Sequence, residues 1–591
     1  MCGICGIYHF DKRQAVQPEL LDRMAQSMVH RGPDGAGAYY DSFVGLGHRR
    51  LSIIDLDGGQ QPMSNETSSV WISFNGEIYN YLELQRDLAA RGHQFRTKSD
   101  TEVIVHAYEE FGVDCVHRLN GMFAFAIWDS SRQRLFLARD HLGIKPLYYT
   151  VTDNAFVFAS EIKALLEFPD VPRAVDLDAV PEYLFCTSFL GNRTMFRDIV
   201  SLPAGHTLVV QDRTTDVRQY WDVAVGGSDD DGTTVDEYAA HTRALLDDSV
   251  RLQLMSDVPF GSLLSGGLDS SIVSAVATQH VSEQLKTFSM EYSKNVEMNR
   301  AGSDVEYARL MAQTFGTDHH EFLFTPEEYH DCHEQATWHL EKPVELTTPS
   351  LFLLHKSLKP HITVVLSGEG ADELFGGYYF FLRDAQQNAV TEFPWAPYFR
   401  EVSQLLDPEL AVATQFQARM RQGLDDLLSR APGTDFLNRV LYMFVKVYLL
   451  EMLERQDKAS MAWSVEARVP YLDHRLVEYV FRMPSQWKLH NGDEKFILKQ
   501  AFEGLLPAQV RQRKKKPFPF PVDPRSLYEQ RGMANELVQC GTSRISPYFD
   551  KKKVGDFLHK RNEFSGIDSL AVFRTSFALI ALDRWHQAFR I

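Results

Sequence analysis

Two glycine-rich segments in the second half of the chain have the composition of a phosphate-binding site. Residues 265–270 read SGGLDS and residues 367–378 read SGEGADELFGGY. Each follows an apolar run expected to be a strand, and the first opens a predicted helix, whose free amide groups favour an anion. Two such loops at the carboxyl ends of parallel strands are typical of a nucleotide site, with Asp269 and Asp372 sharing Mg²⁺. Taken alone, the first loop also fits an ordinary strand-turn-helix connection with serine caps.

The second residue of the chain is a cysteine that becomes N-terminal if an aminopeptidase removes Met1. The α-amino group of Cys2, with a pKa of about 8, would then take the thiol proton and leave a nucleophilic thiolate. Asn75 and Gly76, at the end of a predicted strand, offer an amide group and a backbone NH as an oxyanion hole. A redox or zinc pair with Cys5 is the alternative; it would need a thioredoxin-like βαβ unit or two further ligands, and we find neither.

The first 210 residues contain the elements that must position Cys2 and the oxyanion hole. Short β-rich stretches alternate with turns and with helical patterns, which indicates an α+β layout with sheet packed on sheet and helices outside. Strands are expected at 43–51, 70–74, 123–129, 135–139, 156–160 and 207–211, and helices at 18–29, 81–90 and 101–111.

Residues 211–237 are predicted as a linker between two domains, 1–210 and 238–591, because the end of this stretch combines acidic residues, glycines and threonines without an apolar period. Beyond it, strands and helices alternate, which indicates a parallel sheet wound with helices. Strands are expected at 260–264, 286–290 and 363–366, and helices at 238–251, 270–279, 304–315 and, as a buried helix, near 440–453.

The charge and cysteine content limit the partners and the compartment. The chain has 61 basic and 79 acidic side chains and a formal charge of −18, which argues against nucleic acid as the main partner but leaves small anions open. Six cysteines in 591 residues fit a reducing compartment. We find neither a signal peptide nor an apolar membrane span, so we expect a cytoplasmic protein without a membrane partner.

Taken in order, these motifs resemble the glutamine-dependent asparagine synthetases and their amidotransferase relatives over nearly the whole chain. The resemblance in the first half is carried by MCGICGI, HRGPDG, HRRLSIIDL, NGEIYN, KSDTEV, GMFAFAIWD and ARDHLGIKPLYY. In the second half it is carried by SDVPFGSLLSGGLDSS, LSGEGADELFGGY and DKASMAWSVEARVPYLD. The resemblance implies an N-terminal nucleophile hydrolase domain with an αββα fold, followed by a Rossmann-like ATP pyrophosphatase domain.

The resemblance also implies roles for individual residues. In the first domain Cys2 attacks glutamine, Asn75 and Gly76 hold the oxyanion, and the glutamine-binding set is Arg50, Leu51, Ser52, Ile53, Ile54, Asn75, Gly76, Glu77 and Asp100. In the second domain Glu369 accepts a proton from ammonia and Asp269 and Asp372 hold Mg²⁺. The ATP-binding set is Leu263, Ser265, Gly266, Gly267, Asp269, Ser270, Met290, Ser367, Gly368 and Lys495.

The implied reaction uses glutamine, ATP and an acceptor carboxylic acid, with aspartate as the default acceptor. Glutamine gives ammonia at Cys2, ATP converts the acid into an acyl adenylate, and ammonia displaces AMP to form an amide. A scaffold that keeps the fold without activity is a competing class, disfavoured by the intact motifs. A phosphoribosyl amidotransferase shares the first domain but would lack SGGLDS. A homodimer is one assembly that the sequence allows.

The resemblance weakens at two places. Glu345 stands where an arginine for the substrate carboxylate is expected from the aspartate-using members, and it would repel that carboxylate unless a cation such as Lys342 compensates. The expected consequence is a shifted aspartate site or a different acceptor acid, as in natural-product relatives. The basic stretch from Arg511 to Lys516 is either a solvated loop or a source of a lysine for the pyrophosphate.

Overall fold

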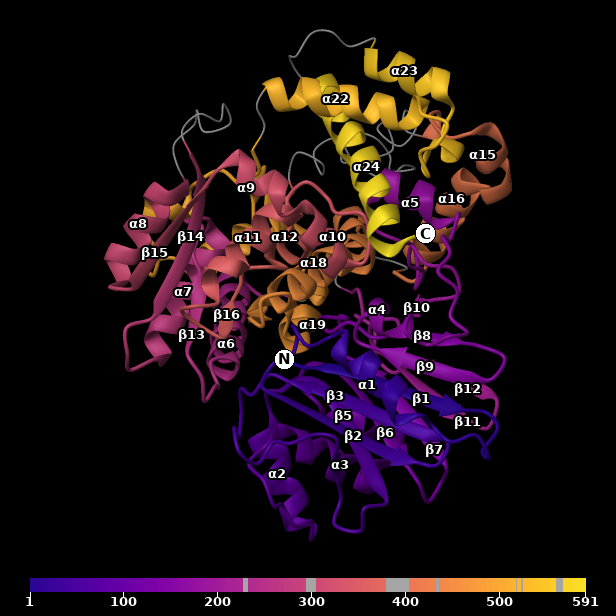
Figure 1. Cartoon of the computed structure of the whole chain (residues 1–591). Helices are drawn as coiled ribbons and strands as arrows, with labels where there is room; N and C mark the ends of the chain where they lie inside the picture. The colour runs from indigo at the N-terminus through magenta and orange to yellow at the C-terminus, as the bar shows by residue number, and fades with distance from the viewer. Residues whose placement is uncertain are drawn as a thin grey trace.

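The computed structural model describes residues 1–226, 232–293, 304–378, 403–431, 435–516, 518–521, 524–559 and 567–591. In Figure 1 the first part of the chain forms a lower half built from β-sheets, and the remainder forms an upper half of helices around a further sheet. The N-terminus lies where the two halves meet (Figure 1). Cys2, the second residue of the chain, therefore lies close to this junction.

Two antiparallel six-stranded sheets make up the first half. Their strand orders are β10-β8-β9-β1-β3-β2 and β12-β11-β7-β6-β5-β4. All six strands predicted for this half are confirmed. The bounds in chain order are β1 (Gly3–His9), β2 (Gly35–Asp41), β3 (Val44–Arg50), β4 (Met63–Ser64), β5 (Val70–Ile78), β6 (Gly121–Asp129), β7 (Arg134–Arg139), β8 (Tyr148–Val151), β9 (Ala155–Ala159), β10 (Val200–Ser201), β11 (His206–Gln211) and β12 (Thr214–Gln219).

Apolar side chains from both sheets meet in one buried layer, which includes Tyr8, Trp128 and Phe158. The outer face of the second sheet packs on α2 (Tyr81–Ala90) and α3 (Asp100–Phe111), and α1 (Pro18–Gln26) and α4 (Ile162–Leu165) pack on the first. The order helix, sheet, sheet, helix confirms the predicted αββα layout. The helices predicted at 18–29, 81–90 and 101–111 are present.

The stretch predicted as a linker contains ordered structure at both ends. Strand β12 pairs with β11 along its whole length, and α6 (Val235–Gln253) begins at the other end. Thr234 and Glu237 form a reciprocal capping box that fixes the start of α6. Residues 227–231 lie outside the described residues. The exact domain boundary stays a prediction.

A parallel five-stranded sheet organises the second half, in the order β15-β14-β13-β16-β17. Its strands are β13 (Phe260–Leu263), β14 (Lys286–Tyr292), β15 (Asp318–Phe324), β16 (Val364–Leu366) and β17 (Glu466–Arg468). The predicted parallel sheet and its three predicted strands are confirmed. Because β14 and β16 lie on opposite sides of β13, the strand order reverses there, and ligands of such sheets bind at that crevice.

Helices surround this sheet and fill the rest of the second half. No helix among the described residues is both long and apolar enough to cross a membrane. The helix predicted near 440–453 is buried and spans α17, a π-helical turn over 444–448 and the start of α18. The helices not yet given are α5 (Ala179–Cys186), α7 (Leu268–His280), α8 (Asp304–Phe315), α9 (Pro326–Asp331), α10 (His333–Leu340), α11 (Thr348–Leu358), α12 (Ala371–Phe375), α15 (Pro408–Thr414), α16 (Phe416–Ser429), α17 (Phe436–Met443), α18 (Leu449–Met461), α19 (His474–Arg482), α20 (Phe496–Ala501), α21 (Ala508–Arg511), α22 (Pro524–Gln539), α23 (Lys551–His559) and α24 (Ile567–Phe589).

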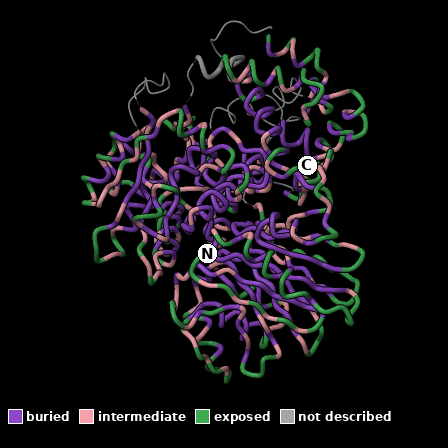
Figure 2. Tube along the Cα trace, in the orientation of Figure 1, coloured by how far each residue is buried: buried purple, intermediate pink, exposed green. Residues whose placement is uncertain are grey.

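The junction between the halves is buried (Figure 2), and its buried residues include charged ones. Arg31 of the first half donates to Asp457 of α18 at 2.8 Å and to Glu161 at 3.0 Å. Lys145 lies 3.3 Å from Asp457. Buried charges are tolerated only when each has a partner, so this network ties α18 to the first half in one register.

Candidate active sites

Cys2 is buried and is held from three directions. Its backbone N–H donates to Asn75 Oδ1 at 2.9 Å, its carbonyl accepts from Arg31 Nε at 3.1 Å, and its Sγ lies 4.0 Å from the Leu51 carbonyl oxygen. Burial raises the pKa of the Cys2 thiol. The nitrogen of Cys2 is a peptide amide here, because Met1 is attached, and the Met1 ammonium pairs with Glu466 at 3.1 Å.

The predicted oxyanion hole lies beside Cys2 on β5. The Asn75 amide nitrogen is buried and has no hydrogen-bond partner among the described residues. Gly76 sits so close to β6 that a Cβ there would lie 2.1 Å from the Met122 carbonyl oxygen. Glycine is therefore required by space at this position.

The segment after β3 forms a loop closed by Arg50. Its guanidinium donates to the carbonyls of Asp55 at 2.6 Å and Leu56 at 2.8 Å, and more weakly to that of Ile54 at 3.3 Å. Ser52 is fixed by an N–H donation to Asp34 at 2.8 Å. The loop also reaches the second half, where Asp257 N–H donates to the Ile53 carbonyl at 3.0 Å.

Two buried acids, Glu77 and Asp100, stand near the Met1 ammonium and the Arg468 guanidinium. Arg468 Nη2 lies 3.7 Å from Glu77 Oε1, while Glu77 Oε2 has no hydrogen-bond partner in the described part of the chain. Asp100 accepts from the Ile78 N–H at 2.9 Å. Burial raises the pKa of Glu77 well above its ordinary value and that of Asp100 to about 6. Such a pair gains stability from a cation such as an ammonium group.

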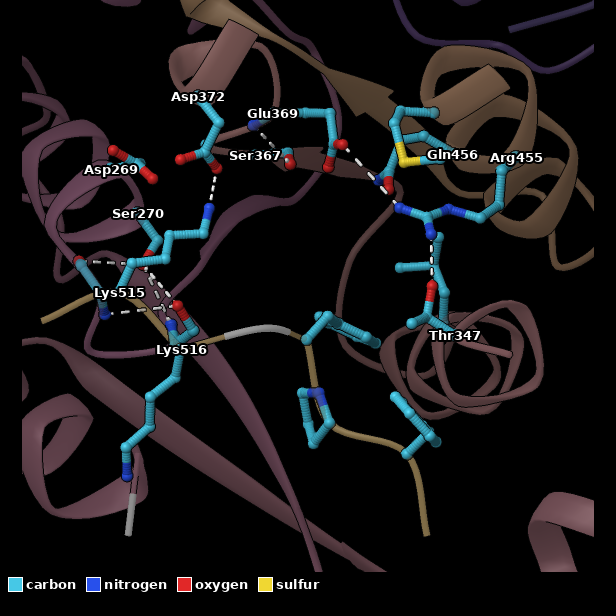
Figure 3. A pocket seen from close by; sticks show the side chains of 18 of the residues that line it. Asp269, Ser270, Thr347, Ser367, Glu369, Asp372, Arg455, Gln456, Lys515 and Lys516 are labelled. Carbon is cyan, nitrogen blue, oxygen red and sulfur yellow. Dashed lines mark hydrogen bonds and ion pairs between the residues drawn. The ribbon is translucent and has the colours of Figure 1, made fainter. Parts of the chain in front are cut away.

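The second candidate site is a pocket of about 460 Å³ at the carboxyl ends of β13 and β16. Figure 3 shows Asp269 and Ser270 from the first glycine loop facing Ser367, Glu369 and Asp372 from the second. Gly266 lies outside the lining, where its carbonyl accepts from Arg513 at 3.0 Å. The predicted residues that line the pocket are Leu263, Ser265, Gly267, Asp269, Ser270, Met290, Ser367, Gly368, Glu369, Asp372 and Lys495.

Glycines hold the two loops against their surroundings. Gly266 has φ +73°, and a Cβ there would lie 2.6 Å from the Ala308 nitrogen. A Cβ on Gly368 would lie 2.9 Å from the Ser270 nitrogen. The loops therefore approach each other at the amino end of α7, where backbone N–H groups are free for an anion.

Two lysines neutralise the predicted metal-binding acids. Lys495 Nζ lies 2.6 Å from a carboxylate oxygen of each of Asp269 and Asp372. Lys515, from the basic stretch, also pairs with Asp372 (Figure 3). Lys495 adopts φ +54°, an uncommon conformation for a residue other than glycine. Both carboxylates thus converge on one cationic position, a donor set that also fits a hard divalent cation.

The other end of the pocket carries an arginine that we did not predict. Arg455 Nη1 donates to Glu345 at 2.7 Å and to the Thr347 hydroxyl, and Nη2 lies 3.8 Å from Glu369. Although burial acts to raise it, Arg455 and Thr347 keep the pKa of Glu345 below its ordinary value. Burial raises the pKa of Glu369 despite Arg455.

The structure corrects one expectation about Glu345. Lys342 does not compensate it, because the Lys342 ammonium pairs with Glu451 and with Glu454, the latter at 2.5 Å. Arg455 compensates Glu345 instead.

The sequence of α18 could have indicated this role of Arg455. The helix carries five charged residues from Glu451 to Lys458 although it is buried, which indicates charges with specific partners rather than a solvated face.

The comparisons with known proteins agree over both halves. Residues 241–587 match the asparagine synthase family and residues 1–221 match the glutamine amidotransferase domain. Glutamine-hydrolyzing asparagine synthetase 3 of Bacillus subtilis (strain 168) is 34% identical, with 100% of this chain and 99% of that protein covered. Glutamine-hydrolyzing asparagine synthetase B of Escherichia coli (strain K12) is 33% identical, with 88% and 82% covered. The chain therefore belongs to the asparagine synthase family, with an amidotransferase domain in its first half.

Proposed function

We propose that the chain converts aspartate to asparagine, using glutamine as the nitrogen source and ATP to activate the acceptor. The products are asparagine, glutamate, AMP and pyrophosphate. The observation that carries this proposal is the pocket in which both glycine loops, Lys495 and Arg455 meet. The relatives in Bacillus subtilis and Escherichia coli are named as glutamine-hydrolyzing asparagine synthetases, which supports the proposal.

Glutamine is hydrolysed at Cys2 after removal of Met1. The freed α-amino group takes the thiol proton, and the sulfur attacks the side-chain amide. The α-amino group passes the proton to the leaving nitrogen, so that ammonia departs and a thioester forms, and water then hydrolyses the thioester to glutamate and the free thiol. The Asn75 amide nitrogen, which has no hydrogen-bond partner among the described residues, and the Gly76 N–H receive the developing oxyanion. Glu77 and Asp100 bind the substrate ammonium, and Arg50, with the loop of Leu51, Ser52, Ile53 and Ile54 that it closes, binds the substrate carboxylate.

ATP binds across the two glycine loops. Leu263 and Met290 border the pocket on the side of β13 and β14, and the free N–H groups at the start of α7 receive phosphate. Mg²⁺ held by Asp269 and Asp372 would neutralise phosphate charge. Lys495 and Lys515 exchange a carboxylate partner for phosphate when the nucleotide enters, so their charges remain compensated.

The acceptor carboxylates need a cation, and we assign Arg455 to this task. Its guanidinium is fixed by Glu345 and Thr347 and lies within 4 Å of Glu369. The departure at Glu345 then has a simple physical explanation: the cation comes from α18, and the acid at 345 orients it. The relatives, named as asparagine synthetases, give no support for a different acceptor.

Strand β17 connects the two sites between which ammonia would have to move. Ser367 N–H donates to the Arg468 carbonyl at 2.8 Å, which joins the second glycine loop to β17. The neighbouring Glu466 on β17 reaches Met1, next to Cys2. Glu369 then accepts the proton that ammonia loses as it attacks the adenylate.

We place the reaction in the cytoplasm, where Cys2 stays reduced.

A pyrophosphate-release screen tests the proposal. Processed protein is incubated with ATP, Mg²⁺ and glutamine, with aspartate, glutamate, malonate or β-alanine as acceptor. We expect release only with aspartate, and asparagine, AMP and pyrophosphate in equal amounts. Turnover of another acid without a response to aspartate would overturn the assignment.

A further inference from the structure

The outer helical layer of the first half brings two histidines and a carboxylate together. His93 lies between α2 and α3, and the buried His106 lies on α3. Their Nδ1 atoms are 3.2 Å apart, and Glu109 Oε2 lies 2.9 Å from His106 Nδ1 and 3.8 Å from His93 Nδ1. These separations let one ion lie about 2.0–2.2 Å from all three atoms, as zinc–nitrogen and zinc–oxygen bonds require.

A carboxylate lies near the second ring nitrogen of each of the two histidines. Glu110 lies 3.5 Å from His93 Nε2, and Glu102 lies 3.7 Å from His106 Nε2. Histidines that bind metals commonly present their second ring nitrogen to a carboxylate, which fixes the ring and raises its basicity. Asn65 donates to Glu109 Oε1 at 2.8 Å, so Oε2 is left toward the histidines.

The local charge also favours a cation. Besides Glu102, Glu109 and Glu110, Glu66 lies 3.9 Å from His106 Nε2, while the nearby Arg91 is paired with Glu110 and Asp87. A set of two imidazole nitrogens and one carboxylate oxygen suits Zn²⁺ and similar transition metals rather than Mg²⁺, which prefers oxygen ligands.

We propose that His93, His106 and Glu109 bind one Zn²⁺ ion, with a water molecule in the fourth position. This site is separate from Cys2 and from the nucleotide pocket and is not needed for the reaction above. It ties the segment between α2 and α3 to α3, the helix that begins at Asp100 of the glutamine site. Zn²⁺ therefore stabilises the first domain and the position of Asp100.

The competing description is a protonated His106 held by carboxylates alone. Against the effect of burial, Glu102 and Glu109 raise the pKa of His106 to about 9. A proton and a metal ion compete for the same Nδ1 atom, so only a metal-binding measurement separates the two descriptions.

The test uses full-length protein treated with a chelator and then titrated with Zn²⁺ or Co²⁺ at about pH 7.5 in the presence of excess Mg²⁺. The variants are His93→Gln and Glu109→Gln. His280→Gln is the matched control, because His280 also pairs with a carboxylate, Asp247 at 3.1 Å, but has no second histidine in its group. Bound metal, the Co²⁺ absorption spectrum and Tm are recorded.

We expect one equivalent of Zn²⁺, a tetrahedral Co²⁺ spectrum and a rise in Tm, all retained in His280→Gln. Both site variants should lose that equivalent and the Tm response while keeping the wild-type circular dichroism spectrum. If wild type and His93→Gln bind the same amount of metal, or neither binds Zn²⁺, the site is an ion-paired histidine cluster and the proposal is wrong.

Discussion

The glutamine site and the nucleotide pocket differ in how closely their acids are paired with cations. Around Cys2, the Arg468 guanidinium lies 3.7 Å from Glu77, and Glu77 Oε2 and Asn75 Nδ2 have no hydrogen-bond partner among the described residues. In the nucleotide pocket, Lys495 forms ion pairs with both Asp269 and Asp372. Arg455 forms an ion pair with Glu345 and lies 3.8 Å from Glu369. In our proposal, one site receives a neutral amide and an ammonium group, and the other exchanges internal ion pairs for a charged ligand.

This difference has an energetic meaning. Unpaired buried groups cost free energy that substrate binding recovers, so the glutamine site needs little rearrangement once Met1 is removed. Ion pairs inside the nucleotide pocket compensate its buried charges without ligand but must separate when phosphate enters. We therefore expect substitutions in the two sites to affect different half-reactions and to differ in their effect on folding.

Among the substitutions Lys495→Met, Asn75→Ala, Arg455→Lys and Asp100→Asn, we expect the first to have the largest effect. Lys495→Met leaves Asp269 and Asp372 without the cation that bridges them and removes a charge that would stabilise the phosphates. We expect asparagine formation with either nitrogen source to fall by about 10³-fold, because such a group acts mainly in the transition state. Glutamine hydrolysis, measured as glutamate release, should be largely unchanged. A parallel loss of both activities would contradict the separation of the sites.

Removing the Asn75 amide should give the opposite pattern. In Asn75→Ala the oxyanion loses one donor, so kcat for glutamine hydrolysis should fall by about 10²-fold. Synthesis with ammonium chloride serves as the internal control and should stay within about twofold of wild type. An equal loss with ammonia would show that Asn75 acts through the fold.

If Arg455 binds the acceptor, its substitution should change mainly the KM for aspartate. Arg455→Lys keeps the charge but loses the planar fork, so we expect the KM for aspartate to rise by about 10-fold or more with a smaller change in kcat. Arg439→Lys, on an exposed position of α17, is the matched control. An unchanged aspartate KM in a folded Arg455→Lys protein would remove Arg455 from the acceptor site.

We expect the smallest effect from Asp100→Asn, which should change the thermal stability of the protein. The pKa of Asp100 is about 6, above its unfolded value of about 4, because the folded protein disfavours the charge. The contribution of Asp100 to stability therefore falls as the pH rises from about 4 to 6. Asp100→Asn should raise Tm by about 2–4 °C at neutral pH, with no gain below about pH 4, while weakening glutamine binding.

Glu83→Gln, on an exposed position of α2, controls for the charge change in Asp100→Asn. The measurement is a thermal unfolding scan at several pH values. A rise in the Tm of Asp100→Asn that is the same at every pH would contradict the claim that burial disfavours the charged form of Asp100.

Much of this architecture could be predicted from local patterns. The strand before SGGLDS, the helix after it and the alternating strands around Asn75 follow directly from apolar periodicity and glycine placement. Strands β15 (DHHEFLF) and β17 (EAR) were not predicted, because edge strands rich in charged and histidine residues lack that period.

The pairing of charges across the chain could not be predicted in the same way. Arg455 and Glu345 are 110 residues apart, and Arg31 and Asp457 are 426 apart. A charged side chain on a helix looks the same in sequence whether it faces water or a buried partner. Only the packing of α18 against both halves shows that Arg455 faces the pocket and Asp457 faces the glutamine domain.

The substitution Cys2→Ala tests the central claim that two separate sites share one reaction. Asparagine formation is measured with glutamine and, separately, with ammonium chloride, and Cys5→Ala is the control for the second cysteine of the pair. We predict that Cys2→Ala loses all glutamine-dependent synthesis but keeps ammonia-dependent synthesis within about twofold of wild type, while Cys5→Ala keeps both. Equal loss of both activities in a folded Cys2→Ala protein, or loss of glutamine use in Cys5→Ala, would contradict the account.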